Sequence, residues 1–197
     1  MKKRFLSTIL IVLFVLASLN TSFAHPHVFV DAQLTLVFDA EGLTSFQETW
    51  AFDEMFSEFI FEDYDKNKNR QFEKAEIAKI KEEVFDNLKN SGYFHVVTIN
   101  GKPFKVTDVN NFSVKVSKGQ VVYAFTIPCK QKYTGSPLVI DFSISDPTVY
   151  TDIIFTKNTP QLAGNSKAFD VSHLLDDGVQ PSGQVLAQTL KITVKRK

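Results

Sequence analysis

The chain has 197 residues with 22 basic and 22 acidic side chains, so its formal net charge is zero. This length suits one domain, and the balanced charge argues against nucleic acid as a partner, because phosphate binding needs a basic face. Cys129 is the only cysteine, which excludes a disulfide within the chain and a zinc site built on two or four cysteines. We expect Cys129 to be a small buried residue at the end of a strand.

Residues 1–24 have the three parts of a secretory signal peptide. Basic residues at positions 2–4 precede an apolar stretch from Ile9 to Leu19, and small residues lead to a cleavage point after Ala24. The apolar stretch is short for a transmembrane helix, and an uncleaved N-terminal anchor is the alternative. Without the signal peptide, 19 basic residues remain against 22 acidic ones, a net charge of −3. We therefore expect an exported periplasmic protein that starts at His25 and does not insert into the membrane.

The segment from Val28 to Phe38 alternates well between a wholly apolar face and a more polar one, which predicts a half-buried strand. After a turn at residues 39–42, a second strand places five residues on one side: Thr44, Phe46, Glu48, Trp50 and Phe52. Two alternating strands joined by a short turn form a predicted β-hairpin.

The period then changes to that of amphipathic helices. Apolar residues recur at spacings of three and four from Phe52 to Tyr64, and again from Ile77 to Leu88. Asp53 and Glu54 suit the acidic first turn of the first helix. We therefore expect an inserted helix–loop–helix over about residues 53–92.

After Gly92 the pattern of short strands returns. Asn100-Gly101 is a strong hairpin signal, and further strands are expected at residues 112–116, 121–127, 138–144, 149–155 and 185–194. A short helix is expected near Val171 to Leu175. The predicted fold class is α+β: one mostly antiparallel, sandwich-like β-rich domain over residues 25–197, with an EF-hand-like helical hairpin inserted near its start.

The segment between the two predicted helices has the spacing of a twelve-residue EF-hand loop. Oxygen ligands would come from positions 1, 3, 5, 7, 9 and 12, which are Asp65, Asn67, Asn69, Gln71 through its backbone carbonyl, Glu73 and Glu76. Phe72 would anchor the loop to the core. Position 6 departs from the motif, because Arg70 replaces the glycine that makes the sharp turn. We therefore expect weak Ca²⁺ binding, with a dissociation constant of about 10⁻⁴ M; the alternative is a polar turn that binds nothing.

Cleavage after Ala24 would create a second candidate metal site at the new N-terminus. His25 and His27 offer two imidazoles beside the α-amine, and such nitrogen donors suit Ni²⁺, Cu²⁺ or Zn²⁺. Pro26 has no N–H, which prevents a square-planar site built on deprotonated amides. Strand parity places Asp31 on the same face, so Asp31 is a candidate third ligand. The alternative is a solvated chain end that contacts nothing.

The remaining histidines form no catalytic pattern. We expect a structural role for His95 at the start of a strand. Ser172 and His173 are adjacent and point in different directions, so they do not form a nucleophile–base pair. We therefore expect no enzymatic activity.

Five segments together resemble a bacterial family of unknown function whose members are described as uncharacterised periplasmic components of ABC-type transport systems. They are HPHVFVDA from residue 25, WAFDEMFS from residue 50, the EF-hand-like loop, SGYF from residue 91 and SDPTVY from residue 145. The resemblance spans nearly all of the chain after residue 24.

Members of that family tend to be encoded near nickel/cobalt or other metal permeases and exporters. The resemblance therefore implies a periplasmic accessory protein of divalent-metal transport, with a membrane metal transporter as its partner. His25 and His27 match the family's opening motif, whereas Arg70 departs from the glycine usual in its loop. The loop residues that match are Asp65, Asn67, Asn69 and Glu76. A two-lobed solute receptor is not expected, because the chain is too short and too rich in strands.

Three functional hypotheses stay open at this point. In the first, the protein is a metal-binding accessory of a divalent-metal transporter. In the second, it is a structural or interaction module whose helical hairpin is stabilised by calcium. The third, a copper oxidase that uses the N-terminal histidine, lacks a further histidine with a spacing that would complete the copper site.

Overall fold

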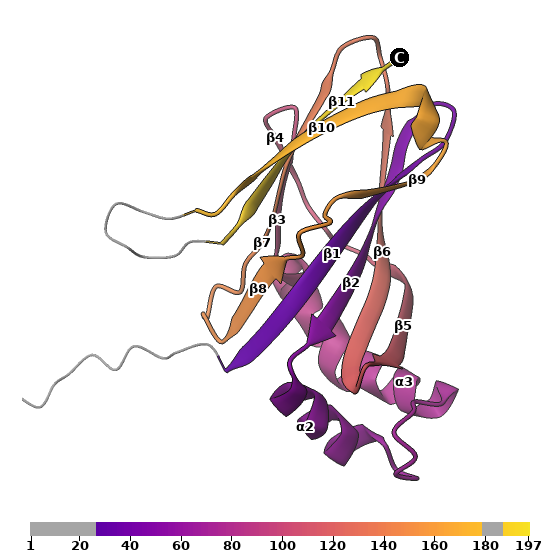
Figure 1. Ribbon diagram of the computed structural model, residues 1–197, viewed down its shortest axis with the longest axis vertical. Helices are drawn as coiled ribbons and strands as arrows, with labels where there is room; N and C mark the ends of the chain where they lie inside the picture. The colour runs from indigo at the N-terminus through magenta and orange to yellow at the C-terminus, as the bar shows by residue number, and fades with distance from the viewer. Residues whose placement is uncertain (1–26, 179–186) are drawn as a thin grey trace, which may run out of the picture.

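The structure, a computed structural model, describes residues 27–178 and 187–197 (Figure 1). The predicted signal peptide and His25 lie outside this part of the chain. Within it, none of the helices has both the length and the apolar character needed to cross a membrane.

Alternation of apolar and polar side chains produces the first hairpin, as predicted. β1 (Val28–Phe38) pairs antiparallel with β2 (Gly42–Phe52), and Ala32 lies opposite Trp50. Every second residue of β1, starting with Val28, is buried. The face that the sequence assigned to the core is therefore confirmed.

β1 and β2 lie in the middle of the first sheet, whose strand order is β5-β6-β2-β1-β8. Its other strands are β5 (Asn110–Ser117), β6 (Gln120–Lys132), β8 (Thr151–Phe155) and β9 (Gln161–Gly164). β5 and β6 form an antiparallel hairpin at the predicted place, whereas β8 and β9 pair with β1 in parallel. These two parallel pairings are exceptions to the predicted antiparallel arrangement.

The second sheet is antiparallel and has the order β10-β11-β7-β3-β4. Its strands are β3 (His95–Ile99), β4 (Lys102–Phe104), β7 (Leu138–Ile144), β10 (Phe169–Asp176) and β11 (Thr189–Arg196). Asn100 and Gly101 join β3 to β4 with positive φ angles of 50° and 73°. This is the backbone that the predicted two-residue hairpin requires.

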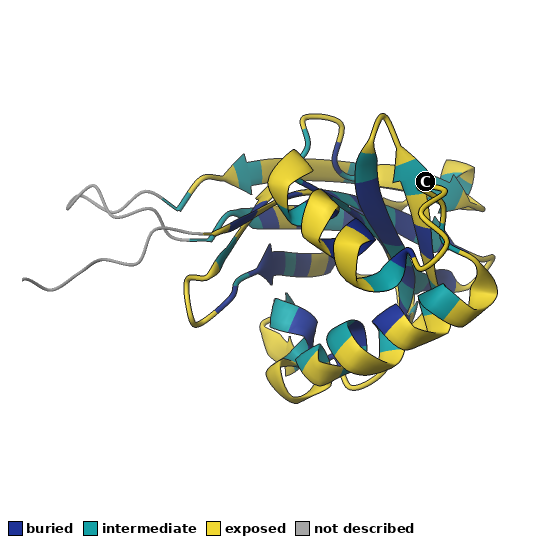
Figure 2. Cartoon of the chain, turned by 90° about the horizontal axis from the view of Figure 1, so that it is seen from below, coloured by how far each residue is buried: buried dark blue, intermediate teal, exposed yellow. Residues whose placement is uncertain are grey.

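The inner faces of the two sheets form one core that is rich in aromatic rings. Phe46 of β2 meets Phe142 of β7 with 4.9 Å between ring centroids, and both side chains are fully buried. Figure 2 shows the buried residues gathered between the layers, with exposed residues along the outer faces. The predicted α+β, sandwich-like fold is therefore confirmed.

Two helical segments follow β2 and close one end of the sandwich (Figure 1). α2 (Glu54–Tyr64) is followed by the predicted loop and then by α3 (Lys74–Ile80). The inner residues Phe61 and Ile80 are buried against the core, while the outer faces of both helices are exposed (Figure 2). The pair is thus an amphipathic cover, as the apolar spacing indicated.

The second helical segment is less regular than predicted. It continues from α3 as a π-helical turn, η1 (Lys81–Phe85), and a 3₁₀ segment, η2 (Asp86–Phe94), where we expected one α-helix. The ring of Phe85 packs on Phe112 and Phe125, at centroid distances of 4.3 and 5.0 Å. The helix therefore departs from regular α geometry at the turn where the Phe85 ring packs into the core.

The prediction of a short helix near Val171 to Leu175 is wrong. These residues belong to β10, which pairs along its whole length with β11 and follows a 3₁₀ turn, η3 (Ser166–Ala168). A short apolar run cannot be assigned to helix or strand by period alone, and here the hydrogen bonds to β11 decide the outcome. His173 consequently lies on an exposed strand and not on a helix.

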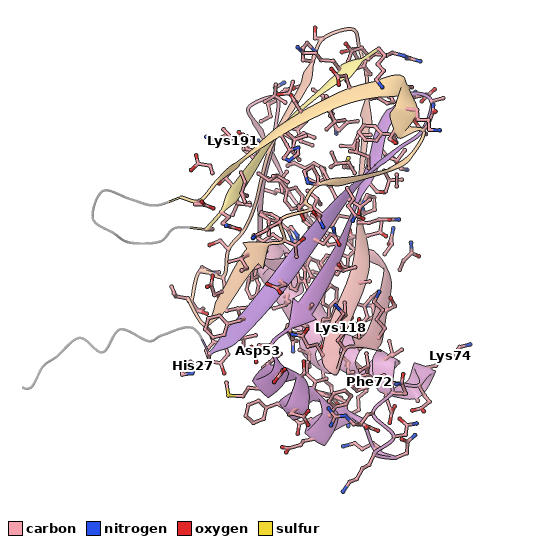
Figure 3. The ribbon with its side chains drawn as sticks, viewed as in Figure 1. His27, Asp53, Phe72, Lys74, Lys118 and Lys191 are labelled. Atoms are coloured by element: carbon pink, nitrogen blue, oxygen red, sulfur yellow. The ribbon has the colours of Figure 1, made fainter. Side chains whose placement is uncertain are left out.

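Asp53 ties α2 to the first sheet. Its Oδ1 accepts the N–H of Phe56 at 2.8 Å and caps the helix, and its Oδ2 accepts the N–H of Phe29 at 2.8 Å. The N–H of Asp53 in turn donates to the carbonyl oxygen of Phe29 at 3.0 Å. The acidic start predicted for this helix is therefore both a cap and a link to β1 (Figure 3).

We expect Asp53→Ala to lower the free energy of unfolding by about 1–2 kcal/mol, because it removes the cap and leaves two N–H groups without an acceptor. Urea denaturation followed by circular dichroism measures this change. Asp63→Ala is the matched control, because Asp63 is exposed at the other end of α2, and we expect a change within about 0.5 kcal/mol. Equal losses in the two variants would contradict the role of Asp53.

Candidate metal-binding sites

The first predicted calcium ligand, Asp65, is buried at the end of α2, with 5 % of its surface exposed. Its Oδ1 accepts the backbone N–H of Asn69 at 3.1 Å, and its Oδ2 accepts that of Arg70 at 2.7 Å. The chain between Asp65 and Arg70 therefore wraps around this carboxylate. A carboxylate on the inner side of the loop is what position 1 of an EF-hand requires.

Two asparagines bring further side-chain oxygens close to the loop backbone. Asn67 Oδ1 accepts the N–H of Asn69 at 3.0 Å, and Asn69 Oδ1 accepts the N–H of Gln71 at 2.7 Å. Turns of this kind, in which a side-chain oxygen binds the backbone two residues later, tighten a loop locally. They hold the predicted donors of positions 3 and 5 in the bend.

The two glutamates of the loop form a capping box at the start of α3. Glu76 Oε2 accepts the N–H of Glu73 at 3.0 Å, and its Oε1 accepts the N–H of Lys66 at 2.9 Å. Position 12 of the loop is thus joined to position 2. The pKa of Glu73 is lowered to about 2, mainly by contact with the Glu76 carboxyl and next by contact with the amide of Asn69. Glu73 is therefore a carboxylate at neutral pH.

Arg70 adopts the left-handed conformation that glycine supplies at position 6 of the motif, with φ of 59°. Its guanidinium donates two hydrogen bonds to Glu58, at 2.6 and 3.1 Å, and lies 4.2 Å from the centre of the Phe61 ring. Phe61 stacks on Phe72 with 5.3 Å between centroids, and Phe72 packs against the core as expected. Side-chain contacts of Arg70 therefore accompany the sharp turn in place of a glycine.

The loop is closed by its own hydrogen bonds. Over residues 27–178 and 187–197, no three His, Cys, Asp or Glu side chains are gathered as metal ligands. Asp65, Glu73 and Glu76 accept hydrogen bonds from backbone or amide N–H groups instead. A bound ion would have to replace some of these donors, above all at Glu76. The donor set itself fits calcium, which prefers carboxylate, amide and carbonyl oxygens.

His27 lies directly before β1, at the same end of the first sheet as Asp53 (Figure 3). Its ring packs on Tyr150 with 5.1 Å between centroids, and its N–H donates to the carbonyl oxygen of Tyr150 at 2.8 Å. Asp31 is exposed four residues further along extended chain, which separates the two Cα atoms by about 13 Å. The structure therefore does not bring Asp31 to His27, and His25 lies outside the described residues.

A buried polar cluster lies inside the sandwich, where no site was expected. Glu48 Oε2 accepts the indole N–H of Trp50 at 2.6 Å, and Glu48 Oε1 lies 2.7 Å from Nε2 of His95. Nδ1 of His95 faces the carbonyl oxygen of Gly92 at 3.2 Å. Both ring nitrogens of His95 therefore lie within hydrogen-bond distance of an oxygen atom. The signal in the sequence was a glutamate on the core-facing side of β2.

This cluster agrees with the structural role expected for His95. The side chains of Glu48 and His95 are fully buried, and the His95 ring packs edge-on against Phe142 with 5.5 Å between centroids. The ring is therefore enclosed by the core and not presented to a solvent ion.

The model of a protein family described as "Protein of unknown function (DUF1007)" matches residues 10–185 of the chain. The protein belongs to this family. It is 31 % identical to an uncharacterised 15.5 kDa protein of Spirochaeta aurantia over 99 residues, which cover 50 % of this chain and 69 % of the relative. It is 27 % identical to an uncharacterised protein of Haemophilus influenzae over 177 residues, which cover 88 % and 84 %. The predicted family of unknown function is confirmed at this level, and these descriptions name neither a transport system nor nickel or cobalt.

We expect Glu48→Ala to lower the free energy of unfolding of this DUF1007 protein by about 3–5 kcal/mol, because His95 and the Trp50 N–H would stay buried without their partner. Urea denaturation measures the loss. Glu62→Ala removes an exposed glutamate near the C-terminal end of α2 and is expected to change the value by less than about 0.5 kcal/mol. If the two variants were equally stable, the cluster would have no role in the core.

Proposed function

We propose that this DUF1007 protein is an exported, non-catalytic, periplasmic metal-binding accessory of a divalent-metal transporter. In this proposal the loop from Asp65 to Glu76 binds Ca²⁺ weakly, and the histidines at the mature N-terminus bind a transition-metal ion. The backbone of Arg70 is the observation that carries the calcium part.

The left-handed conformation of Arg70 supports calcium binding, because an arginine does not adopt it without cost. A non-glycine residue in this region costs roughly 1 kcal/mol, and such strain tends to be kept at functional sites. Here the Asp65 carboxylate accepts the Arg70 N–H, and Glu58 holds the side chain. Lys68 of the same loop also has a positive φ, of 58°, so the loop holds two non-glycine residues in this region.

The donor set supports the same conclusion. Six residues of the loop offer an oxygen, and calcium takes six to eight oxygen ligands. Three of the donors are carboxylates, so their charge offsets that of the ion. Glu76 must exchange its hydrogen bonds to Lys66 and Glu73 for the ion, and this competition favours weak binding, with a dissociation constant of about 10⁻⁴ M.

The proposed transition-metal site consists of His25, His27 and the α-amine that cleavage would free. Nitrogen donors of this kind suit Ni²⁺, Cu²⁺ or Zn²⁺. His27 is exposed and packs on Tyr150, which would orient the ring at the surface. Asp31 is left out of this set because of its distance along β1. The transporter partner is proposed from the resemblance to proteins encoded beside metal permeases.

A specific observation favours a second candidate function, an interaction module whose helical pair calcium stabilises. Met55 and Phe59 of α2 are 57 % and 54 % exposed and lie one helical turn apart. An exposed apolar face beside the loop suits contact with a protein partner. Transition-metal binding that needs the N-terminal histidines would separate the first function from this one.

Isothermal titration calorimetry of the mature protein tests the calcium part. After dialysis against a chelator, we expect saturable Ca²⁺ binding with a dissociation constant of about 10⁻⁴ M. At 100 times that concentration, calcium should stabilise the fold by about 2.7 kcal/mol, a rise in melting temperature of roughly 5–10 °C.

Glu76→Gln should weaken this binding at least tenfold, because it removes the ligand that can bind bidentately. Glu82→Gln removes an exposed glutamate just beyond α3 and should leave binding unchanged. A flat titration of the parent protein, with an unaltered melting temperature, would end the calcium proposal.

Titration with Ni²⁺, Cu²⁺ and Zn²⁺ tests the N-terminal site. We expect one ion to bind the mature protein and the double variant His25→Ala, His27→Ala to lose that binding at least tenfold. His173→Ala is the control, because His173 is an exposed histidine on a distant strand. Binding that survives the double variant would remove this site from the proposed function.

A further inference from the structure

Among the described residues the two sheets have four edges, and three of them are protected against pairing with another chain. β4 has only three residues and carries Lys102 and Pro103. β5 carries Lys115 and has a register shift between Asn110 and Ser113. β8 and β9, which pair with β1 at the third edge, have only five and four residues. Short strands, bulges, lysine and proline are the means by which natural sheets avoid edge-to-edge association.

β10 forms the fourth edge and has none of these features (Figure 1). Its eight residues pair with β11 in one continuous register, and they include neither lysine nor proline. Leu174 of β10 is 64 % exposed, more than any other large apolar side chain that the structure describes. The free side of an edge strand presents backbone N–H and C=O groups to solvent. A long, regular and partly apolar edge of this kind therefore suits the addition of a strand.

A second copy of the chain can supply that strand. A two-fold axis perpendicular to the sheet brings the same edge of two copies together in antiparallel orientation. Directly opposite residues then lie on the same face of the joined sheet. If Leu174 lies opposite Leu174 of the second copy, each copy covers the exposed leucine of the other.

The charges of β10 favour this register. It places Ser172 opposite Asp176 of the second copy, so no two carboxylates of the strands lie opposite each other. A register centred on His173 would instead place Asp170 opposite Asp176 twice, and like charges directly opposite each other are destabilising. The register centred on Leu174 thus combines apolar contact with the absence of charge repulsion.

We propose that the protein forms a two-fold symmetric homodimer in which the β10 strands of two copies pair antiparallel and join the two second sheets into one continuous sheet. One pair of strands is small compared with a standard protein interface, so we expect a dissociation constant of about 10⁻⁴ M. β10 lies away from the helical pair (Figure 1). The dimer therefore goes beyond the metal-binding function and does not depend on it.

Sedimentation velocity of the mature protein over a range of concentrations tests the dimer. We expect the sedimentation coefficient to rise from the monomer value toward the dimer value as the concentration passes about 10⁻⁴ M. Leu174→Lys should weaken dimerisation at least tenfold, because a lysine on an edge strand opposes pairing. Val96→Lys is the matched control and should leave dimerisation unchanged, because Val96 is 61 % exposed on β3, inside the same sheet. Circular dichroism confirms that each variant is folded.

Leu174→Cys tests the register. The Cβ atoms of directly opposite residues lie about 4.5–5.5 Å apart, close to the separation in a disulfide, so oxidised glutathione should link two copies through this position. Val96→Cys is the control and should stay unlinked. Cys129 is buried, and burial raises the pKa of its thiol to about 12, so it does not compete.

A mature protein that stays monomeric at millimolar concentration would overturn the dimer, and this is also the result expected if the edge takes a strand from a different protein. A dimer that Leu174→Lys leaves intact would overturn the role of β10. So would a dimer that Val96→Lys weakens equally, since that result would indicate contact through the outer face of the sheet. A dimer in which Leu174→Cys forms no disulfide would overturn the register.

Discussion

The buried carboxylate of Asp65 decides the shape of the connection between α2 and α3. By accepting the N–H groups of Asn69 and Arg70, it draws the chain into a bend in which a non-glycine residue takes a left-handed conformation. The other oxygen-bearing side chains then turn toward the same short stretch of backbone. Without this one acceptor, the strained residue would have little to hold it, and the donors of the proposed calcium site would not be brought together.

The same loop is packed into the sandwich through aromatic rings. Arg70 lies over Phe61, which stacks on Phe72 and is buried against the core. Further along the segment, Phe85 reaches the first sheet and packs on Phe125. The proposed calcium loop and Phe85 therefore belong to one structural unit, the helical pair that closes the end of the sandwich. The position of this pair is set by side-chain packing more than by regular helical geometry, as the π-helical turn before Asp86 illustrates.

Local patterns in the sequence predicted the features that depend on neighbours in the chain. Alternation placed Val28 and its partners in the core, and Asn100-Gly101 marked a hairpin, because period and turn chemistry are local properties. The residues near Val171 were misassigned because their partner strand is not visible in a short window. The contact between Glu48 and His95 joins residues 47 apart, so no spacing rule could have indicated it. Parity put Asp31 and His27 on one face, although the rise of the predicted strand already separates their Cα atoms by about 13 Å, too far for one ion.

A two-dimensional ¹⁵N–¹H NMR titration of the mature protein with Ca²⁺ tests the central claim most directly. If the bend around Asp65 binds the ion, the largest shifts will fall on the amides of residues 65–76, with the Arg70 amide among them and the strands of the second sheet unmoved. Unchanged loop amides at millimolar Ca²⁺, or shifts confined to acidic residues elsewhere on the surface, would contradict it.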